Sequence, residues 1–546
     1  MKDFVKHTLF TFLIITTLPF VSLAQGTAKK EITKSWYQLD KTNGNYYGIS
    51  LDKAYGFVKG KTSKQVIVAV LDTGVDTLHE DLKNVLWHNP KEIPGNAIDD
   101  DDNGYVDDVY GWNFLGGKDG KNVYQDSDES ARIYHKLKAK YGTSIPDSSS
   151  AKNPEVKAEI EMYRKVKEKI EIDVDPNEIL FIKRILPSLK KGDSIISKDL
   201  NKTQYTCEDL KNYFPTNVYA QNTKSVHLST CKLNKNNDDI SNKNVIDNYE
   251  KELRKAEAVD NPPKDFRGEI VKDDELNIND RFYGNSDVMA GAHSHGSHTA
   301  GIIAASRNNG KGMDGIADNV KIMTVRVLPP EGDEHDKDIA LGIRYAVDNG
   351  AQIISMSFGK YFSPQKKWVD DAIKYAEAKD VLLLHAAGND AKNIDMADHY
   401  PASTYSDGKG RANNFITVGA SGDLVNGGIV AEFSNYGKKE VDVFAPGVKI
   451  YSTIPGNDYA SYNGTSMACP IVAGIAAFIL EYYPDLSANQ LKYVIEKSSV
   501  SLKEKIKMPG SEQDVALSDI SKTGGIVNAY EAVKLAATIK GERINK

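Results

Sequence analysis

The chain has 546 residues, a net charge of −7 and a hydrophobic fraction of 40%, which are ordinary values for a soluble globular protein. Its 69 basic and 76 acidic residues exclude a uniformly basic nucleic-acid-binding protein, and we expect no nucleic-acid partner. Three cysteines are too few for a disulfide framework. The length predicts about three or four domains, although single domains can be larger.

Residues 1–24 have the pattern of a secretory signal peptide. Lys2 and Lys6 precede an apolar stretch over residues 8–21, and small residues at Ser22 and Ala24 predict cleavage before Gln25. The alternative is an uncleaved membrane anchor, but the apolar stretch is shorter than the roughly 20 residues that a span prefers. We therefore expect an exported protein (secreted, periplasmic or at the cell surface) with no stable membrane span after cleavage.

The rest of the chain divides by composition into residues 25–115, 116–265 and 266–540. The first part contains a β-branched run at 66–71, typical of a strand buried on both faces of a parallel sheet. The second part is rich in Lys, Glu, Asp and Asn, and predicts helices over 153–170 and 244–258. An apolar stripe at helical spacing marks the first of them: Val156, Ile160, Tyr163, Val166 and Ile170.

Two of the three cysteines, Cys207 and Cys231, lie in the charged segment 116–265. A disulfide between them is plausible in an exported protein, and two free thiols are the alternative.

The last part of the chain alternates strand and helix patterns. It predicts helices over 338–349 and 470–483, and strands over 321–327, 353–357, 381–385 and 415–418. Strands that alternate with helices indicate βαβ units and a parallel sheet covered by helices on both faces. The expected fold is therefore α/β, with a mainly helical insertion at 116–265.

Three short motifs carry groups that can react. Asp72 lies in Val-Leu-Asp-Thr-Gly, His295 in His-Ser-His-Gly-Ser-His, and Ser466 in Asn-Gly-Thr-Ser-Met-Ala. A serine hydroxyl is a poor nucleophile near pH 7 unless a base takes its proton and a third group orients that base. The three motifs together supply these three groups.

The order Asp, His, Ser resembles that of the subtilisin-like serine proteases, the subtilases. The resemblance implies a three-layer α/β fold in which Asp72 orients His295, His295 is the general base and Ser466 is the nucleophile. It also implies that Asn389 completes the oxyanion hole. Ser466 follows His295 by 171 residues, close to the roughly 157 in subtilisin. His295 follows Asp72 by 223 residues, against roughly 32, so nearly two hundred residues are inserted there.

The same resemblance implies a site for polypeptide substrates. Two short segments would form the walls of the pocket for the P1 side chain, and an extended substrate would pair with them as an added strand. Their small residues predict room for a large apolar or aromatic side chain, while the pocket floor near Tyr400 and Pro401 is not assigned. The wall residues are Ser357, Phe358 and Gly359 on one side, and Ala386, Ala387 and Gly388 on the other.

An acidic stretch over residues 98–108 predicts a calcium site. Asp99, Asp101, Asn103 and the Tyr105 carbonyl have the ligand spacing of positions 1, 3, 5 and 7 of a calcium loop, with a glycine at position 6. Tyr110 stands where such a loop ends in glutamate. Asp107 or Asp108 would therefore have to close the shell. The alternative is an acidic surface turn.

A second, weaker calcium site is expected at Asp81. Its partner would be the loop over residues 308–312, where Lys311 argues against a cation.

Each catalytic motif alone has another interpretation. An Asp-Thr-Gly loop also occurs in aspartic proteases, but their chemistry needs two such carboxylates and no second loop is present. His293, His295 and His298 have spacings that recur in metal sites, but no acidic or cysteine partner follows at a recognisable offset. A catalytically silent relative that only binds peptide is the remaining alternative for the whole chain.

The insertion at 116–265 leaves the catalytic region after Asp72 and returns just before His295. We expect it to pack near the active-site face and to limit access to the site. The alternatives are a mini-domain that points into solvent and a passive surface elaboration. The sequence does not indicate an oligomeric state.

Overall fold

The computed structural model describes residues 33–42, 44–173, 175–233, 240–290, 294–423 and 428–543. The predicted signal peptide and His293 lie outside these residues. Lys34–Lys546 form one compact unit, to which the description below applies.

A nine-stranded sheet runs through the catalytic region in the order β10-β13-β7-β6-β5-β4-β1-β3-β2. Neighbouring strands are parallel throughout, except for β10 and β13 at one edge. The strands are β1 (Val66–Asp72), β2 (Gly111–Asn113), β3 (Val320–Arg326), β4 (Ile353–Met356), β5 (Leu382–Ala386), β6 (Phe415–Ser421), β7 (Val443–Pro446), β10 (Val500–Ser501) and β13 (Gly525–Ile526).

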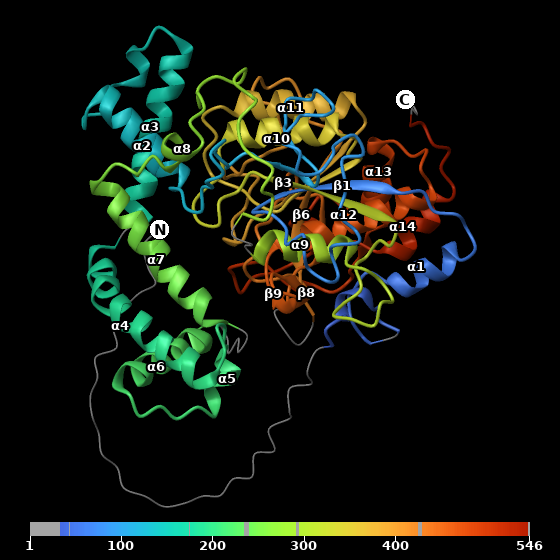
Figure 1. The fold of residues 1–546 in the computed structure, drawn as a ribbon, viewed down its shortest axis with the longest axis horizontal. Coiled ribbons are helices and arrows are strands. Elements are labelled where there is room, and N and C mark those ends of the chain that lie inside the picture. Colours follow the sequence, from blue (N-terminus) through green and yellow to red (C-terminus); the bar gives the residue numbers. More distant parts are fainter. Residues whose placement is uncertain are drawn as a thin grey trace, which may run out of the picture. The chain divides into compact units, whose positions relative to one another are not determined.

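Helices cover both faces of this sheet, as Figure 1 shows, and so confirm the three-layer α/β fold. The helices α10 (Asp336–Asp348) and α11 (Lys366–Ala378) pack on one face, and α9 (Ser294–Ala304) and α12 (Thr465–Tyr482) on the other. Smaller elements complete this region: α1 (Leu51–Val58), α13 (Ala488–Ser498), α14 (Ala529–Ala536), the hairpin β8 (Ile450–Ile454) with β9 (Asp458–Tyr462), and β11 (Ile506–Lys507) with β12 (Asp514–Val515).

The central helix α12 is buried almost along its whole length. Among the described helices it alone is long and apolar enough to cross a membrane, but 89% of it is buried inside the protein, as expected of a core helix. It begins at Thr465, five residues before the predicted start, because Pro470 lies within the helix rather than at its first turn. The predicted strands agree with the structure to within one to three residues.

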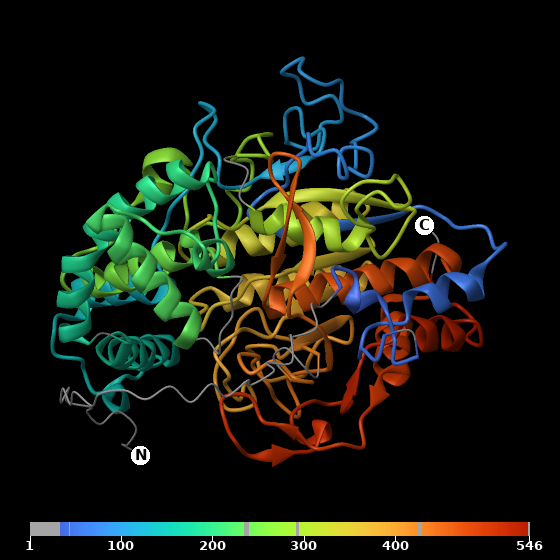
Figure 2. The same ribbon diagram turned by 90° about the horizontal axis from the view of Figure 1, so that it is seen from below.

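The insertion is helical, as predicted, and Figure 2 shows its helices gathered beside the sheet. The helix predicted over 153–170 is α3, and that predicted over 244–258 is α7. The helices are α2 (Glu129–Tyr141), α3 (Pro154–Asp173), α4 (Pro176–Leu200), α5 (Cys207–Lys211), α6 (Val218–Leu233) and α7 (Asn242–Asp260), followed by α8 (Phe266–Ile270).

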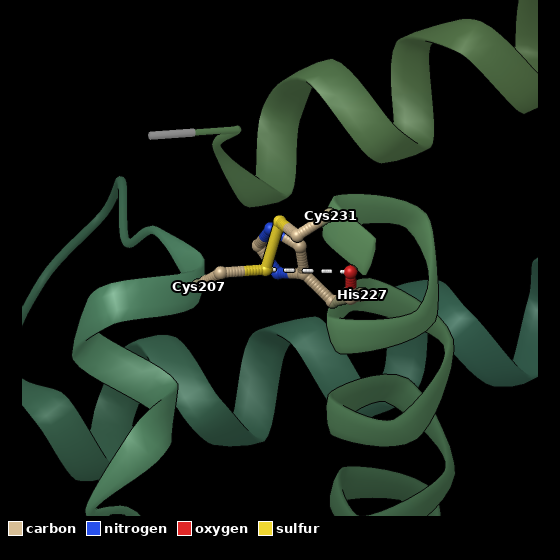
Figure 3. A group of neighbouring side chains, drawn as sticks. All are labelled: Cys207, His227 and Cys231. Atoms are coloured by element: carbon tan, nitrogen blue, oxygen red, sulfur yellow. Dashed lines mark hydrogen bonds between the residues drawn. A yellow bond between two sulfur atoms is a disulfide. The ribbon is translucent and has the colours of Figure 1, made fainter. Parts of the chain in front are cut away.

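A disulfide joins Cys207 at the start of α5 to Cys231 in α6. Figure 3 shows the imidazole of His227 beside the bridge, and its Nε2 lies 2.7 Å from the carbonyl oxygen of Ile240. Of the two alternatives for these cysteines, the structure therefore has the bridge. It ties two helices of the insertion together across 24 residues of sequence.

Candidate active site

Asp72 and His295 form a hydrogen-bonded pair. Asp72 is the last residue of β1, and its side chain is 1% exposed. His295 is the second residue of α9, and its Nδ1 lies 2.7 Å from Asp72 Oδ1. The Thr73 backbone N–H donates to the same carboxylate oxygen at 2.7 Å. The carboxylate is therefore fixed in position and fixes the ring in turn.

A glycine allows this pair to form. The start of α9 approaches the β1 turn so closely that a Cβ on Gly296 would lie 2.1 Å from the carbonyl oxygen of Gly74. The Gly296 N–H donates to Thr73 Oγ1 at 3.1 Å. A side chain at position 296 would push the helix away and pull His295 from Asp72.

The charge of Asp72 raises the pKa of His295 and so makes its imidazole a stronger base. Burial lowers the pKa of its imidazole, but the Asp72 charge and the hydrogen bond to Asp72 outweigh burial, and the pKa is raised above its ordinary value. The neighbouring His298 lies outside this pair. It is buried, stacks on Tyr462 and binds the Ala460 carbonyl at 3.0 Å, which fits a structural role.

Ser466 is the second residue of α12, and two hydrogen bonds join it to Ser357. Its Oγ donates to the Ser357 carbonyl at 2.9 Å, while Ser357 Oγ donates to the Ser466 carbonyl at 3.0 Å. The second bond is available because Pro470, four residues on, has no N–H to donate to the Ser466 carbonyl. The proline thus ties the candidate nucleophile to the predicted substrate wall.

The sheet register brings these groups to one edge. Leu71 of β1 pairs with Met356 of β4, so the residues that follow, Asp72 and Ser357, stand side by side at the carboxyl ends of parallel strands. Ligand and active sites of open α/β sheets lie at this edge.

Asn389 is held through its amide oxygen, and its amide nitrogen has no acceptor among the residues that the structure describes. Its Oδ1 accepts hydrogen bonds from the Thr465 backbone N–H and the Thr465 hydroxyl, both at 2.9 Å. A backbone N–H cannot accept, so this contact fixes which amide atom is oxygen. Within the described part of the chain, no acceptor is found for the Ser466 N–H. The two donors, at the positive end of α12, fit an oxyanion hole.

A cavity of about 740 Å³ adjoins Ser466 and Asn389. Five of the six predicted wall residues line it: Ser357, Phe358, Gly359, Ala386 and Gly388. The sixth, Ala387, faces the core instead: it is fully buried, and its N–H and C=O pair with Val418 and Asn435.

Sequence reasoning missed His399 at the floor of this cavity. Its Nε2 lies 2.7 Å from where a Cβ on Gly359 would be, and 3.0 Å from where one on Gly388 would be. The imidazole therefore stands between the two walls and narrows the space expected for a large P1 side chain. The signal was present in the sequence as the residue before Tyr400-Pro401, but only the fold brings it to the pocket.

Comparison with known proteins decides the family. The model of the subtilase family (peptidase S8) matches residues 63–518. The chain belongs to the subtilase family. It is 40% identical over 222 residues to a thermophilic serine proteinase of Bacillus sp. (strain AK1), covering 41% of this chain and 50% of that protein. It is 38% identical over 253 residues to thermitase of Thermoactinomyces vulgaris, covering 46% of this chain and 79% of thermitase.

The chain thus spans half the length of the first of these relatives. A solved protease structure from Pseudoalteromonas arctica PAMC 21717 aligns with a TM-score of 0.45 and 22% identity, covering 92% of this chain and 97% of that one.

The acidic loop of this subtilase offers a cluster of oxygen ligands. Carboxylate oxygens of Glu92, Asp99 and Asp101 lie within 4.8 Å of one another. Glu92 Oε2 is buried and has no hydrogen-bond partner among the described residues. A hard cation such as calcium suits such a set, and it would satisfy the orphaned oxygen. Glu92 was missed because it precedes the spacing pattern by seven residues.

The other predicted ligands of the loop have different roles. Asp107 accepts the backbone N–H groups of Gly95 and Ala97, both at 2.8 Å. Asp108 is fully buried, and burial raises the pKa of its carboxyl to about 6 against the bonds from Tyr345, Asn89 and Asn103. Neither carboxylate joins the cluster of Glu92, Asp99 and Asp101. Asn103 Oδ1 accepts the Tyr105 N–H at 2.8 Å, so this pair stabilises the turn.

Asp81 does meet the predicted partner loop. Its buried carboxylate accepts hydrogen bonds from Asn309 Nδ2 at 2.5 Å and from the Tyr459 hydroxyl at 2.8 Å. Lys311 pairs with Glu80, beside it. The amide, the phenol and the lysine are the partners that these carboxylates have among the described residues, and a calcium ion at this second site stays a prediction.

Proposed function

We propose that the protein is an exported serine endopeptidase that hydrolyses peptide bonds through an acyl-enzyme on Ser466. The observation that carries the proposal is the convergence of the Asp72–His295 pair, Ser466 and Asn389 at the carboxyl edge of the sheet. Membership of the subtilase family supports it.

In the proposed reaction, the Ser466 hydroxyl leaves the Ser357 carbonyl and donates to His295 Nε2. As Ser466 Oγ forms a bond to the scissile carbonyl carbon, His295 takes the proton, and Asp72 stabilises the resulting imidazolium. The carbonyl oxygen becomes negative and accepts from Asn389 Nδ2 and the Ser466 N–H. His295 then gives its proton to the departing amine, and the acyl-enzyme remains. Water, deprotonated by His295, attacks the acyl carbon in the same way, and the acid is released as Ser466 regains its proton.

A structural calcium ion and export from the cytoplasm belong to the same proposal. Glu92, Asp99 and Asp101 would hold the ion, whose role is to stabilise the loop between β1 and β2. Export is supported by the signal-peptide pattern of residues 1–24 and by the Cys207–Cys231 disulfide, because such bridges persist in oxidising compartments.

Hydrolysis of a chromogenic tetrapeptide anilide by the wild type and by Ser466→Ala tests the proposal. We expect kcat to fall by about 10⁶-fold, the scale of the loss when a nucleophile of this kind is removed. Ser461→Ala, on the exposed face of β9, is the matched control and should keep full activity. A folded wild type without hydrolysis would favour the silent, peptide-binding relative, and an active Ser466→Ala would refute the assigned nucleophile.

A further inference from the structure

The cavity beside Ser466 has a wall that the catalytic region does not supply. Its opposite side is lined by residues from three insertion helices, among them Ala131 of α2, Ile170 of α3, and Lys255 and Ala258 of α7. The cavity has the size of pockets that enclose small ligands. A folded domain cannot enter such a space, whereas an extended chain can.

A buried ion pair also joins the insertion to residues 357–362, which we call the substrate edge. Lys360 directly follows the wall residues 357–359, and its side chain is fully buried. Its Nζ lies 2.6 Å from Glu129 Oε2 at the first residue of α2, and 3.0 Å from Asp336 Oδ1. Arg132, one helical turn on, binds the same Glu129 oxygen at 2.9 Å. A lysine in this position needs these carboxylates, because an unpaired buried charge is costly.

Apolar packing joins the insertion to the same segment at Phe362, two residues after Lys360. Phe362 lies in a hydrophobic cluster whose other buried members all belong to the insertion: Ile133, Tyr134 and Leu137 of α2, and Tyr163, Val166 and Ile170 of α3. This cluster contains most of the apolar stripe seen in the sequence. The backbone of Lys360 meanwhile pairs with Tyr400, the residue after His399. The substrate edge 357–362 therefore lies between the pocket floor and the insertion.

From these contacts we propose that the insertion is part of the substrate site. Its helices α2, α3 and α7 form one wall of the cleft, and Glu129 and Lys360 act as positioning residues for the substrate edge 357–362. The substrate class that fits is polypeptide already in extended, unfolded form, long enough to pass between the edge and α7. This inference rests on the proposed peptidase function and names the substrate class of the same site.

The ion pair is tested with Glu129→Gln and Lys360→Met in the full chain. We expect KM for a tetrapeptide anilide to rise about 10-fold or more, because small displacements of a positioning group have large kinetic effects. The rate at which a small fluorophosphonate phosphonylates Ser466, with loss of fluoride, should change little, because that probe forms no strand pairing with the edge. Lys165→Gln, in the exposed Lys165–Asp398 pair between the same two regions, is the matched control and should leave KM unchanged.

If Glu129→Gln does not fold, Lys360→Met serves alone, because its carboxylate partners keep Arg132 and Ser363. Unchanged KM in the folded variants would overturn the positioning role. A wild type that fails to react with the fluorophosphonate would instead overturn the peptidase proposal, so the two failures are distinguishable.

The wall is tested with Ala258→Trp, which narrows the cavity, against Asn248→Trp on the exposed side of α7. We expect Ala258→Trp alone to slow cleavage of reduced and alkylated lysozyme, while fluorophosphonate labelling stays fast. Wild-type enzyme should cleave this unfolded substrate far faster than native lysozyme. Equal rates of cleavage of native and unfolded lysozyme, or equal rates of cleavage of unfolded lysozyme by the two tryptophan variants, would refute the proposal that the insertion forms a wall of the substrate site.

Discussion

At the scale of single residues, His295 carries a prediction about pH. A base must be neutral to accept a proton, so kcat/KM should fall as the pH drops through the pKa of His295. That pKa is raised, so the acid limb should lie above the ordinary value of about 6.5. Asp72→Asn removes the charge that raises it and should shift the limb to lower pH, with a loss of about 10⁴-fold in kcat. The pH profile of kcat/KM gives the position of the limb and kcat at the plateau gives the loss, and an unshifted limb in Asp72→Asn would contradict the pairing.

His399 carries a prediction about specificity. Its imidazole fills the space between Gly359 and Gly388, so the pocket should prefer a small P1 side chain such as alanine. His399→Gly should raise kcat/KM for a phenylalanine anilide relative to an alanine anilide by about 10–200-fold, the scale of pocket discrimination. Burial lowers the pKa of His399 to about 4, so the ring is neutral above pH 5 and the preference should not vary from there upward.

The matched control for this prediction is His88→Gly, an exposed histidine outside the cavity, which should not change the ratio of the two substrates. A wild type that already prefers phenylalanine, or an unchanged ratio in His399→Gly, would show that the imidazole does not set the P1 preference.

At the scale of elements, the acidic loop predicts sensitivity to chelation. A ligand bound only to the folded state stabilises it by about 2.7 kcal/mol at a hundred times its Kd. Excess EGTA should therefore lower the Tm, and added calcium should restore it. In Asp99→Asn/Asp101→Asn, the Tm should be low from the start and insensitive to EGTA. Equal Tm values with EGTA and with calcium in the wild type would refute the site.

The elements also show what the sequence can predict. The β-branched run before Asp72 and the later strands were predictable, because a strand buried on both faces leaves a continuous apolar signature. The start of α12 was not predictable, because a proline usually indicates the first turn of a helix. Pro470 instead lies inside α12, where the Ser466 carbonyl that its missing N–H leaves free accepts a hydrogen bond from Ser357. Glu92 was missed for a similar reason: its part in the acidic cluster depends on the fold of the loop and not on spacing.

At the scale of the whole molecule, the sequence predicted the candidate catalytic groups and a position for the insertion near the active-site face, but not the contacts that hold the insertion there. Asp72, His295 and Ser466 each sit in a motif, so local sequence identifies them. The contact between Glu129 and Lys360 joins residues 231 positions apart, and nothing local in either residue indicates the other. The expectation that the insertion packs near the active-site face agrees with the shared cavity, while its effect on access stays a prediction.

An activated nucleophile at Ser466 should react with a fluorophosphonate, so labelling of the wild-type protein is the decisive experiment. The protein is treated with a fluorophosphonate, digested with trypsin, and its labelled peptide is identified by mass spectrometry. We expect one adduct per chain, on Ser466, formed quickly in the wild type and at least about 10³-fold more slowly in His295→Ala, which lacks the base. A folded protein without an adduct, or an adduct on another serine, would contradict this expectation.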